Sequence, residues 1–202
     1  QDPSGGILRD PEAKPEAQIL IDNPRIPLSA FHVEDANGTI TITTAKAQIQ
    51  LDKNTSLLKV TNLETNAVVL EESKPVNFEK DKVTVTLKEN PKEYFYGGGV
   101  QNGRFSHKGK AIAIENQNSW TDGGVASPTP FYWSTNGYGI LWYTFKKGKY
   151  DFGAEEQGSV KLSHETDYLD LFCMISSSPT ALLNDFYQLT GNPVLLLSLI
   201  HI

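Results

Sequence analysis

The sequence predicts an all-β domain built as an antiparallel sandwich of two sheets, with one short helix near its C-terminal end. Many short segments alternate apolar and polar residues with a period of two, which is the pattern of half-buried strands. Turn signals such as Asn37-Gly38 and Asn136-Gly137 separate these segments. Only one segment has a helical period, and a hydrophobic content of 39% in 202 residues suffices for the core of one domain.

The first 27 residues differ from the rest of the chain in composition. They hold five of the eleven prolines, together with charges and the pair Gly5-Gly6. This composition indicates an extended Pro-rich lead-in with one strand at residues 18–21. There is neither an initial Met nor an apolar leader, so either a leader was removed or the chain is an excised piece. We expect a lead-in over residues 1–27, a sandwich domain over 28–177, and a helix with a linker over 178–202.

The first strands follow from turn chemistry and from alternation. Asn37-Gly38 predicts a hairpin that joins a strand at residues 31–34 to one at 39–43. Residues 82–88 are the clearest strand, because Val83, Val85 and Leu87 alternate with polar residues. The other strands of this half are expected at residues 46–51, 57–61 and 68–71, the last two joined around Thr65-Asn66.

The second half of the chain contains two segments that are apolar at nearly every position, residues 130–134 and 138–144. Continuous apolar character over a short length is typical of a strand that is buried on both faces. The remaining strands are expected at residues 110–115, 160–163 and 168–175.

One helix is expected directly after these strands. Ser178 is a suitable N-cap, Pro179 fits the first helical position, and Gly191 is placed as the C-terminal stop. The apolar residues that fall on one helical face are Leu182, Leu183, Phe186 and Leu189.

Composition excludes several classes of function. The net charge is −6 with both signs interspersed, so the clustered basic face of a nucleic-acid-binding protein is absent. No apolar run approaches the roughly 20 residues that span a bilayer, so no membrane segment is expected. A single cysteine forbids an intrachain disulfide and a cysteine cluster for zinc, and the four histidines lie far apart. We therefore expect neither a metal nor another cofactor.

Three consecutive glycines, Gly97, Gly98 and Gly99, suggest a phosphate-binding loop at first reading, together with Gly103. The dinucleotide fingerprint requires a following helix and a Walker loop requires a terminal G-K-[ST], and neither pattern is present. The favoured interpretation is a bend, where glycine supplies a positive φ or lets another backbone come close.

The strongest candidate site lies in the loop expected at residues 118–127, which contains Trp120, Thr121 and Asp122 beside Gly123-Gly124 and is followed by Pro128 and Pro130. An indole face packs well on the C–H surface of a pyranose ring, and a carboxylate accepts hydrogen bonds from sugar hydroxyls. The alternative is purely structural, with Trp120 plugging the end of the sandwich and Asp122 capping a turn. The residues by themselves leave both interpretations open.

Five further motifs are Y-F-Y-G-G-G at residues 94–99, W-T-D at 120–122, P-F-Y-W-S at 130–134, Y-G-I-L-W-Y at 138–143 and L-T-G-N-P at 189–193. Together they resemble glycoside hydrolase family 31, which includes α-glucosidases and α-xylosidases. The chain is similar to the N-terminal β-sandwich of those enzymes, whose fold is galactose-mutarotase-like, and its end is similar to the link into their (β/α)₈ barrel. A barrel takes about 250 residues, so it is absent from this chain.

The resemblance implies that the barrel carries out catalysis and that the sandwich supports it. In that family the barrel carries two carboxylates that hydrolyse an α-linked glycoside with retention, so we expect no catalytic residue in this chain and no activity of the chain alone. The loop with Trp120, Thr121 and Asp122 is expected to contact an α-linked glycoside or oligosaccharide beside the barrel. Surface that faces the missing barrel is expected to cause self-association. The resemblance also favours a periplasmic or secreted location.

Two other functions compete with this one. The chain can be a free-standing carbohydrate-binding sandwich, because its strand set is complete and it carries aromatic residues suited to sugars. A sandwich with its own mutarotase activity needs a histidine paired with a carboxylate, and the sequence pairs neither His107 nor His164 in this way.

Overall fold

The computed structural model describes residues 30–193. This part of the chain contains thirteen strands and one helix, α1 (Pro179–Thr190). The strands of the N-terminal half are β1 (His32–Ala36), β2 (Thr39–Thr43), β3 (Ala47–Asp52), β4 (Leu58–Asn62), β5 (Ala67–Glu79) and β6 (Lys82–Lys88). The later strands are β7 (Phe95–Gln101), β8 (Ala111–Ile114), β9 (Val125–Ser134), β10 (Tyr138–Trp142), β11 (Gly148–Phe152), β12 (Ser159–His164) and β13 (Leu171–Ile175).

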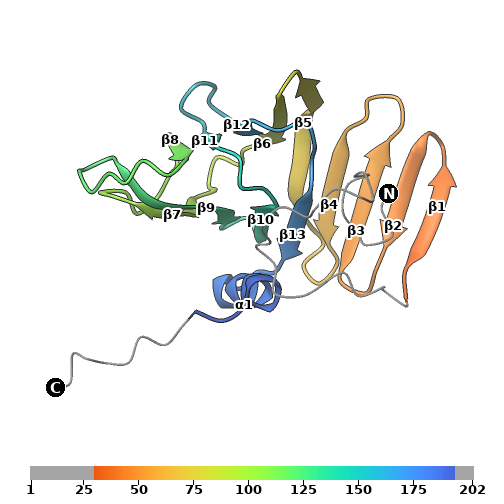
Figure 1. Cartoon of the computed structure of the whole chain (residues 1–202). Helices are drawn as coiled ribbons and strands as arrows, with labels where there is room; N and C mark the ends of the chain where they lie inside the picture. Colours follow the sequence, from red (N-terminus) through yellow and green to blue (C-terminus); the bar gives the residue numbers. More distant parts are fainter. Residues whose placement is uncertain (1–29, 194–202) are drawn as a thin grey trace, which may run out of the picture.

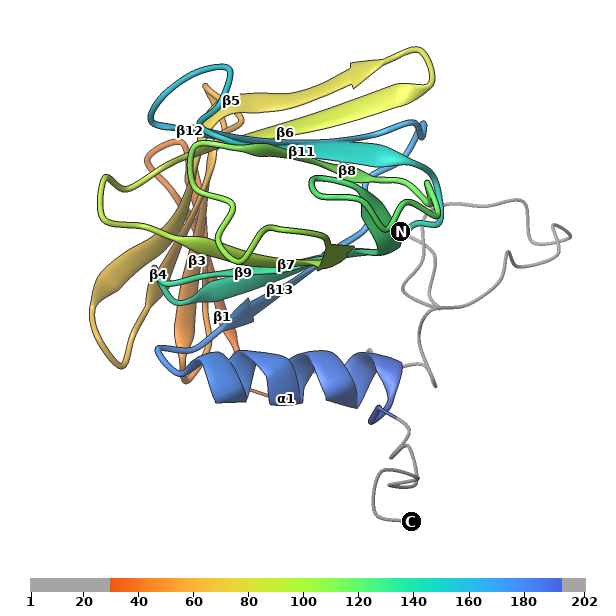
Figure 2. The ribbon, with the colours of Figure 1, turned by 90° about the vertical axis from the view of Figure 1, so that its left-hand side faces the viewer.

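The strands form two antiparallel sheets, which confirms the predicted all-β sandwich. The large sheet has nine strands in the order β1-β2-β3-β4-β5-β6-β12-β11-β8, and the small sheet has four in the order β13-β10-β9-β7. Figure 2 shows three layers: strands β5, β6, β8, β11 and β12 of the large sheet, the small sheet beneath them, and α1 beneath the small sheet. Strands β1 to β4 extend past the small sheet to one side (Figure 1).

The predicted hairpins are confirmed. β1 pairs with β2 around Asn37-Gly38, and β4 pairs with β5 around Thr65-Asn66. β5 is much longer than expected because irregularities in its register let it bend and continue beside β6. Two strands were not predicted, β7 and β11. The lead-in over residues 1–27, the strand expected at 18–21, and residues 194–202 lie outside the described part of the chain.

The main core lies between the two sheets. It combines aliphatic residues of the large sheet with aromatic residues of the small sheet, such as Val85, Leu162, Tyr132 and Trp142. Every residue of β10 is buried, as its continuous apolar sequence predicted. Both faces of β10 are covered, because Ile140 belongs to the core between the sheets and Leu141 belongs to a second cluster between the small sheet and α1.

Helix α1 covers the outer face of the small sheet. Ser178 is its N-cap, with Oγ accepting a hydrogen bond from Ala181 N at 3.4 Å, and Gly191 ends it. The predicted apolar face is confirmed, since Leu182 is buried and Phe186 stacks on Phe131 with ring centroids 4.2 Å apart. Among residues 30–193 no helix has the length and apolar character that a bilayer crossing requires.

The glycines of β7 allow two strands to approach closely. Gly99 has a φ of +79°, and a Cβ added there would clash with the carbonyl oxygen of Ser127 on β9. The register between β7 and β9 is irregular at this point. The expected bend is therefore confirmed, but it lies inside a strand.

Candidate functional site

The candidate loop connects β8 to β9 and is shorter than expected. β9 begins at Val125, so residues 125–127 belong to a strand and the prediction of a loop through residue 127 is wrong at that end. Val125 belongs to the strand because it pairs with Gln101 of β7. The loop proper therefore ends at Gly124, directly after the three predicted site residues.

Backbone hydrogen bonds close the loop on itself. Ser119 N donates to Val125 O at 3.0 Å, and Gly124 N donates to Thr121 O at 2.9 Å. The hydroxyl oxygens of Ser119 and Thr121 lie 3.0 Å apart, within hydrogen-bond distance. Thr121 thus helps to hold the loop closed while its two neighbours carry the larger functional groups.

Trp120 and Asp122 both project from the surface. The side chain of Trp120 is 73% exposed, so it does not plug the end of the sandwich. Within residues 30–193 no backbone amide donates to the Asp122 carboxylate, so this group caps no turn there. The structural alternative for these two residues is therefore not supported, and an indole face and a carboxylate both remain open to solvent.

A second turn supports the loop. The sequence predicted a bend that includes Gly103, but not its contact with the loop. Asn102, Gly103 and Arg104 follow β7 and lie against residues 119–124. Asn102 N donates to Gly124 O at 3.0 Å, and Gly123 N donates to Asn102 O at 2.9 Å. Asn102-Gly103 is a dipeptide that is typical of turns, but its contacts with the loop run mostly through backbone groups, so the sequence did not indicate which segment the turn would meet.

Aromatic side chains continue from this region over the outer face of the small sheet. The rings of Tyr96 and Trp133 stack with centroids 4.6 Å apart, and Phe105 meets Tyr96 edge-on at 5.6 Å. Phe105 is 88% exposed. We refer to Tyr96, Phe105 and Trp133 as the aromatic ridge.

The two buried histidines do not form an acid–base site. His107 Nε2 lies 2.8 Å from Gly97 O, and His164 lies between the Lys146 carbonyl and the Tyr150 hydroxyl. Burial lowers the pKa of both imidazoles, that of His164 to about 4. Neither ring meets a carboxylate among residues 30–193, so the pairing that mutarotase chemistry needs is absent there. The same residues contain no cluster of three or more His, Cys, Asp or Glu suited to a metal.

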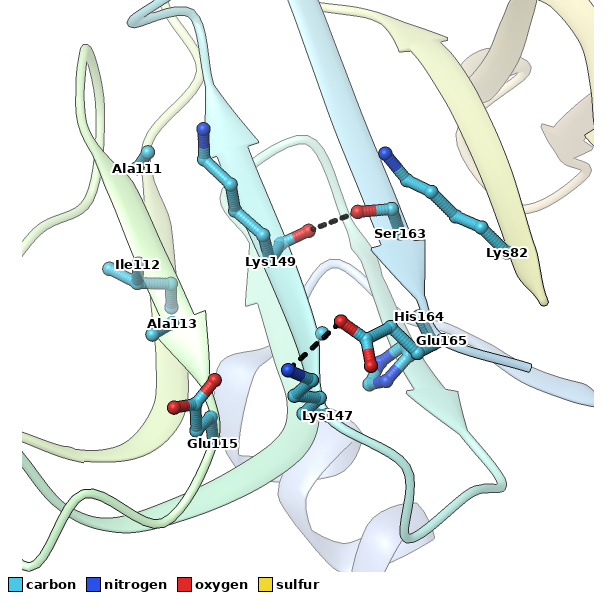
Figure 3. A pocket seen from close by; sticks show the side chains of 11 residues that line it. Lys82, Ala111, Ile112, Ala113, Glu115, Lys147, Lys149, Ser163, His164 and Glu165 are labelled. Carbon is cyan, nitrogen blue, oxygen red and sulfur yellow. Dashed lines mark hydrogen bonds and ion pairs between the residues drawn. The ribbon is translucent and has the colours of Figure 1, made fainter. Parts of the chain in front are cut away.

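A shallow hollow of about 400 Å³ lies on the large sheet, across the ends of β6, β8, β11 and β12 (Figure 3). Ala111, Ala113 and Ser163 line it with small side chains. Its charges compensate one another, since Lys147 Nζ lies 3.1 Å from Glu165 Oε1. No ring of Trp, Tyr or Phe lines the hollow, so it is a weaker candidate for a sugar than the loop.

The fold and the loop define a β-sandwich domain with a candidate carbohydrate-binding loop at one end. The family model described as the glycosyl hydrolase 31 N-terminal galactose mutarotase-like domain matches residues 6–151, and the chain belongs to this family. The resemblance predicted from the motifs is thereby confirmed.

Two relatives of the chain are α-xylosidases. The chain is 25% identical over 149 residues to alpha-xylosidase XylQ of Lactiplantibacillus pentosus, which covers 71% of this chain and 18% of that protein. It is 32% identical over 104 residues to an alpha-xylosidase of Emericella nidulans, which covers 51% of this chain and 13% of that protein. The chain therefore spans less than a fifth of the length of either enzyme.

Solved structures share the fold. A GH31 dextranase of Flavobacterium johnsoniae in complex with isomaltotriose matches with a TM-score of 0.79 and 17% identity, over 88% of this chain and 23% of that one. A GH31 alpha-xylosidase from a soil metagenome, in complex with xylose, matches with a TM-score of 0.73 and 19% identity, over 90% of this chain and 29% of that one.

Proposed function

We propose that this chain is the non-catalytic N-terminal domain of a retaining α-glycosidase of the α-glucosidase or α-xylosidase type. It supports the catalytic (β/α)₈ barrel and lends the loop with Trp120, Thr121 and Asp122 to the sugar site. On this proposal residues 28–177 form the sandwich, and residues 178–202 hold the helix and the linker toward the barrel. The observation that carries the proposal is an exposed Trp–Asp loop on a domain of this family.

The comparisons support a sugar as the ligand. Both named relatives are α-xylosidases, and the two solved structures hold xylose and isomaltotriose. The chemistry of the loop fits such ligands. The indole of Trp120 offers a flat apolar face to a pyranose ring, and the carboxylate oxygens of Asp122 accept hydrogen bonds from hydroxyl groups.

Nuclear magnetic resonance titration of the ¹⁵N-labelled chain with xylose and isomaltotriose tests the sugar contact. We expect the amide signals of Trp120, Thr121 and Asp122 to shift with millimolar affinity, because one loop offers few contacts without its barrel. Trp120→Ala should remove these shifts. Phe78→Ala is the matched control, since Phe78 is also an exposed aromatic residue but lies on β5 in the large sheet.

The outcomes separate the competing functions. Shifts that gather at Lys147 and Lys149, or no shift at the loop, would contradict the proposed sugar contact. Micromolar affinity that is lost in Trp120→Ala would favour a free-standing carbohydrate-binding module. We also expect no turnover of nitrophenyl α-glucoside or α-xyloside by the purified chain, and clear turnover after host enzymes are removed would overturn its non-catalytic role.

A further inference from the structure

We propose that Asn102 and Gly103 are positioning residues that hold the Asp122 carboxylate in place for a sugar ligand. This inference rests on the proposed function, because it concerns the same loop. Its new element is that a separate turn, about 20 residues earlier in the chain, positions the carboxylate.

Asn102 forms hydrogen bonds with both ends of the loop. Its side-chain Nδ2 donates to Ser119 O at 2.7 Å, at the beginning of the loop. Its backbone N–H and C=O bind Gly124 and Gly123, at the end of the loop. Three hydrogen bonds from one residue therefore fix the distance between the two ends of the segment that carries Trp120 and Asp122.

Gly103 provides the space for the carboxylate. A Cβ added at Gly103 would coincide with Oδ1 of Asp122, and all three of its nearest atoms belong to that carboxylate. The Asp122 side chain thus lies directly over the Cα of Gly103. Any side chain at position 103 must displace it, whereas glycine lets the carboxylate rest against the backbone.

Arg104 fixes the turn itself to the rest of the fold. Its guanidinium Nη1 donates to Ala111 O on the edge strand β8 at 2.7 Å. The turn is therefore attached to β7 by the chain, to β8 by Arg104 and to the loop by Asn102. This arrangement presents the carboxylate on a supported surface, with its oxygens available to sugar hydroxyls.

The glycines of the chain offer a matched pair of variants. Gly103 has a φ of +68° and Gly109 has a φ of +69°, but a Cβ added at Gly109 meets nothing within 4 Å. Gly103→Ala and Gly109→Ala therefore introduce the same backbone strain, and only the first meets Asp122. Any difference between the two variants reports the contact with the carboxylate.

We expect Gly103→Ala to shift the amide signals of residues 119–124 in the free chain, and Gly109→Ala to leave them in place. Sugar affinity should fall about tenfold in Gly103→Ala and stay within about twofold in Gly109→Ala. In an Asp122→Ala background the two glycine substitutions should lower the melting temperature equally, because the displaced group is gone. Asn102→Ala, which keeps the backbone hydrogen bonds, should shift the same signals if Gly103→Ala does not fold.

The readouts distinguish this inference from the proposed function. Unchanged loop signals in Gly103→Ala and Asn102→Ala would overturn the positioning role, whatever the sugar affinity is. Displaced loop signals with unchanged sugar affinity would preserve the positioning role and overturn the sugar contact of Asp122. A melting-temperature difference between the glycine variants that persists without the Asp122 carboxylate would also contradict the inference.

Discussion

His164 is a buried titratable residue whose contact with a backbone carbonyl specifies which ring nitrogen carries the proton in the neutral form. Its Nδ1 lies 2.8 Å from the Lys146 carbonyl, which can only accept, so Nδ1 carries the proton. Nε2 then accepts from the Tyr150 hydroxyl at 3.0 Å. The neutral ring satisfies both contacts, and burial holds its pKa at about 4, below the usual value of 6.5.

This pKa predicts a loss of stability in acid. Between pH 6.5 and about 4 the unfolded imidazole binds a proton that the folded one does not, so the stabilisation is full above pH 6.5 and disappears as the pH falls to about 4. The contribution is roughly 3 kcal/mol. Urea unfolding across this range should therefore show a shallower pH dependence in His164→Asn than in the wild type.

His32→Asn is the control, because His32 is exposed on β1. It should keep the wild-type pH dependence. The buried Glu72 and Glu93 have raised pKa values through desolvation and act in the opposite direction, whereas His107 acts in the same direction as His164. These contributions cancel when the variant is compared with the wild type, because both proteins share them. An equal pH dependence of the free energy of unfolding in His164→Asn and the wild type would show that the prediction is wrong.

At the scale of elements, α1 and the outer face of the small sheet form a core of their own. Leu182 of α1 is 1% exposed and packs with Phe131, Leu141 and Met174. Only this single helix protects that face within the described residues, so its contact residues carry much of the attachment.

Leu182→Ala should destabilise the chain by about 2–5 kcal/mol, because it removes buried methyl groups and leaves a cavity. Chemical denaturation measures this loss. Asn184→Ala lies on the exposed side of the same helix and should change the free energy of unfolding very little. A loss in Leu182→Ala no larger than that in Asn184→Ala would contradict the packing described for α1.

The elements also show what the sequence can predict. Strands with alternation or continuous apolar character, such as β6 and β10, were predicted with nearly correct ends. β7 was missed because three glycines carry no side-chain pattern, and β11 because its Gly-Lys-Tyr-Asp-Phe sequence has a buried aspartate. The Asp151 Oδ1 atom accepts hydrogen bonds from the backbone amides of residues 153–155, a local role that alternation does not reveal.

The candidate site was predictable only in part, for a related reason. Trp120 and Asp122 have side chains whose chemistry suggests sugar binding by itself. Asn102 acts through its backbone and its side-chain amide, and Gly103 through the absence of a side chain, across about 20 positions of sequence. Such contacts depend on how β7 and β9 pair, and no pattern in the sequence predicted this pairing.

At the scale of the whole molecule, the aromatic ridge is a partly covered apolar surface on the same face that α1 protects elsewhere. Phe105 is exposed, whereas Tyr96 and Trp133 are half-buried. We predict that two copies of the chain associate through it, because burying the exposed Phe105 and its neighbours removes apolar area from water. Sedimentation velocity at increasing concentration should show association, and Phe105→Ser should weaken it.

Phe78→Ser is the matched control, since Phe78 is 59% exposed but lies in the large sheet. It should leave association unchanged. A wild-type chain that stays monomeric at high concentration, or equal weakening by the two substitutions, would contradict a role for the aromatic ridge.

The strand order of the large sheet has a consequence for synthesis on the ribosome. β1 to β6 pair in sequence order, so each can join its neighbour as soon as it is made, through contacts that are local in the chain. β8 pairs with β11, and β11 pairs with β12, which is the neighbour of β6. β8 can therefore join the sheet only after these two later strands have been made. A nascent chain is thus expected to hold a six-stranded meander first, and to close its core only after β12 has emerged.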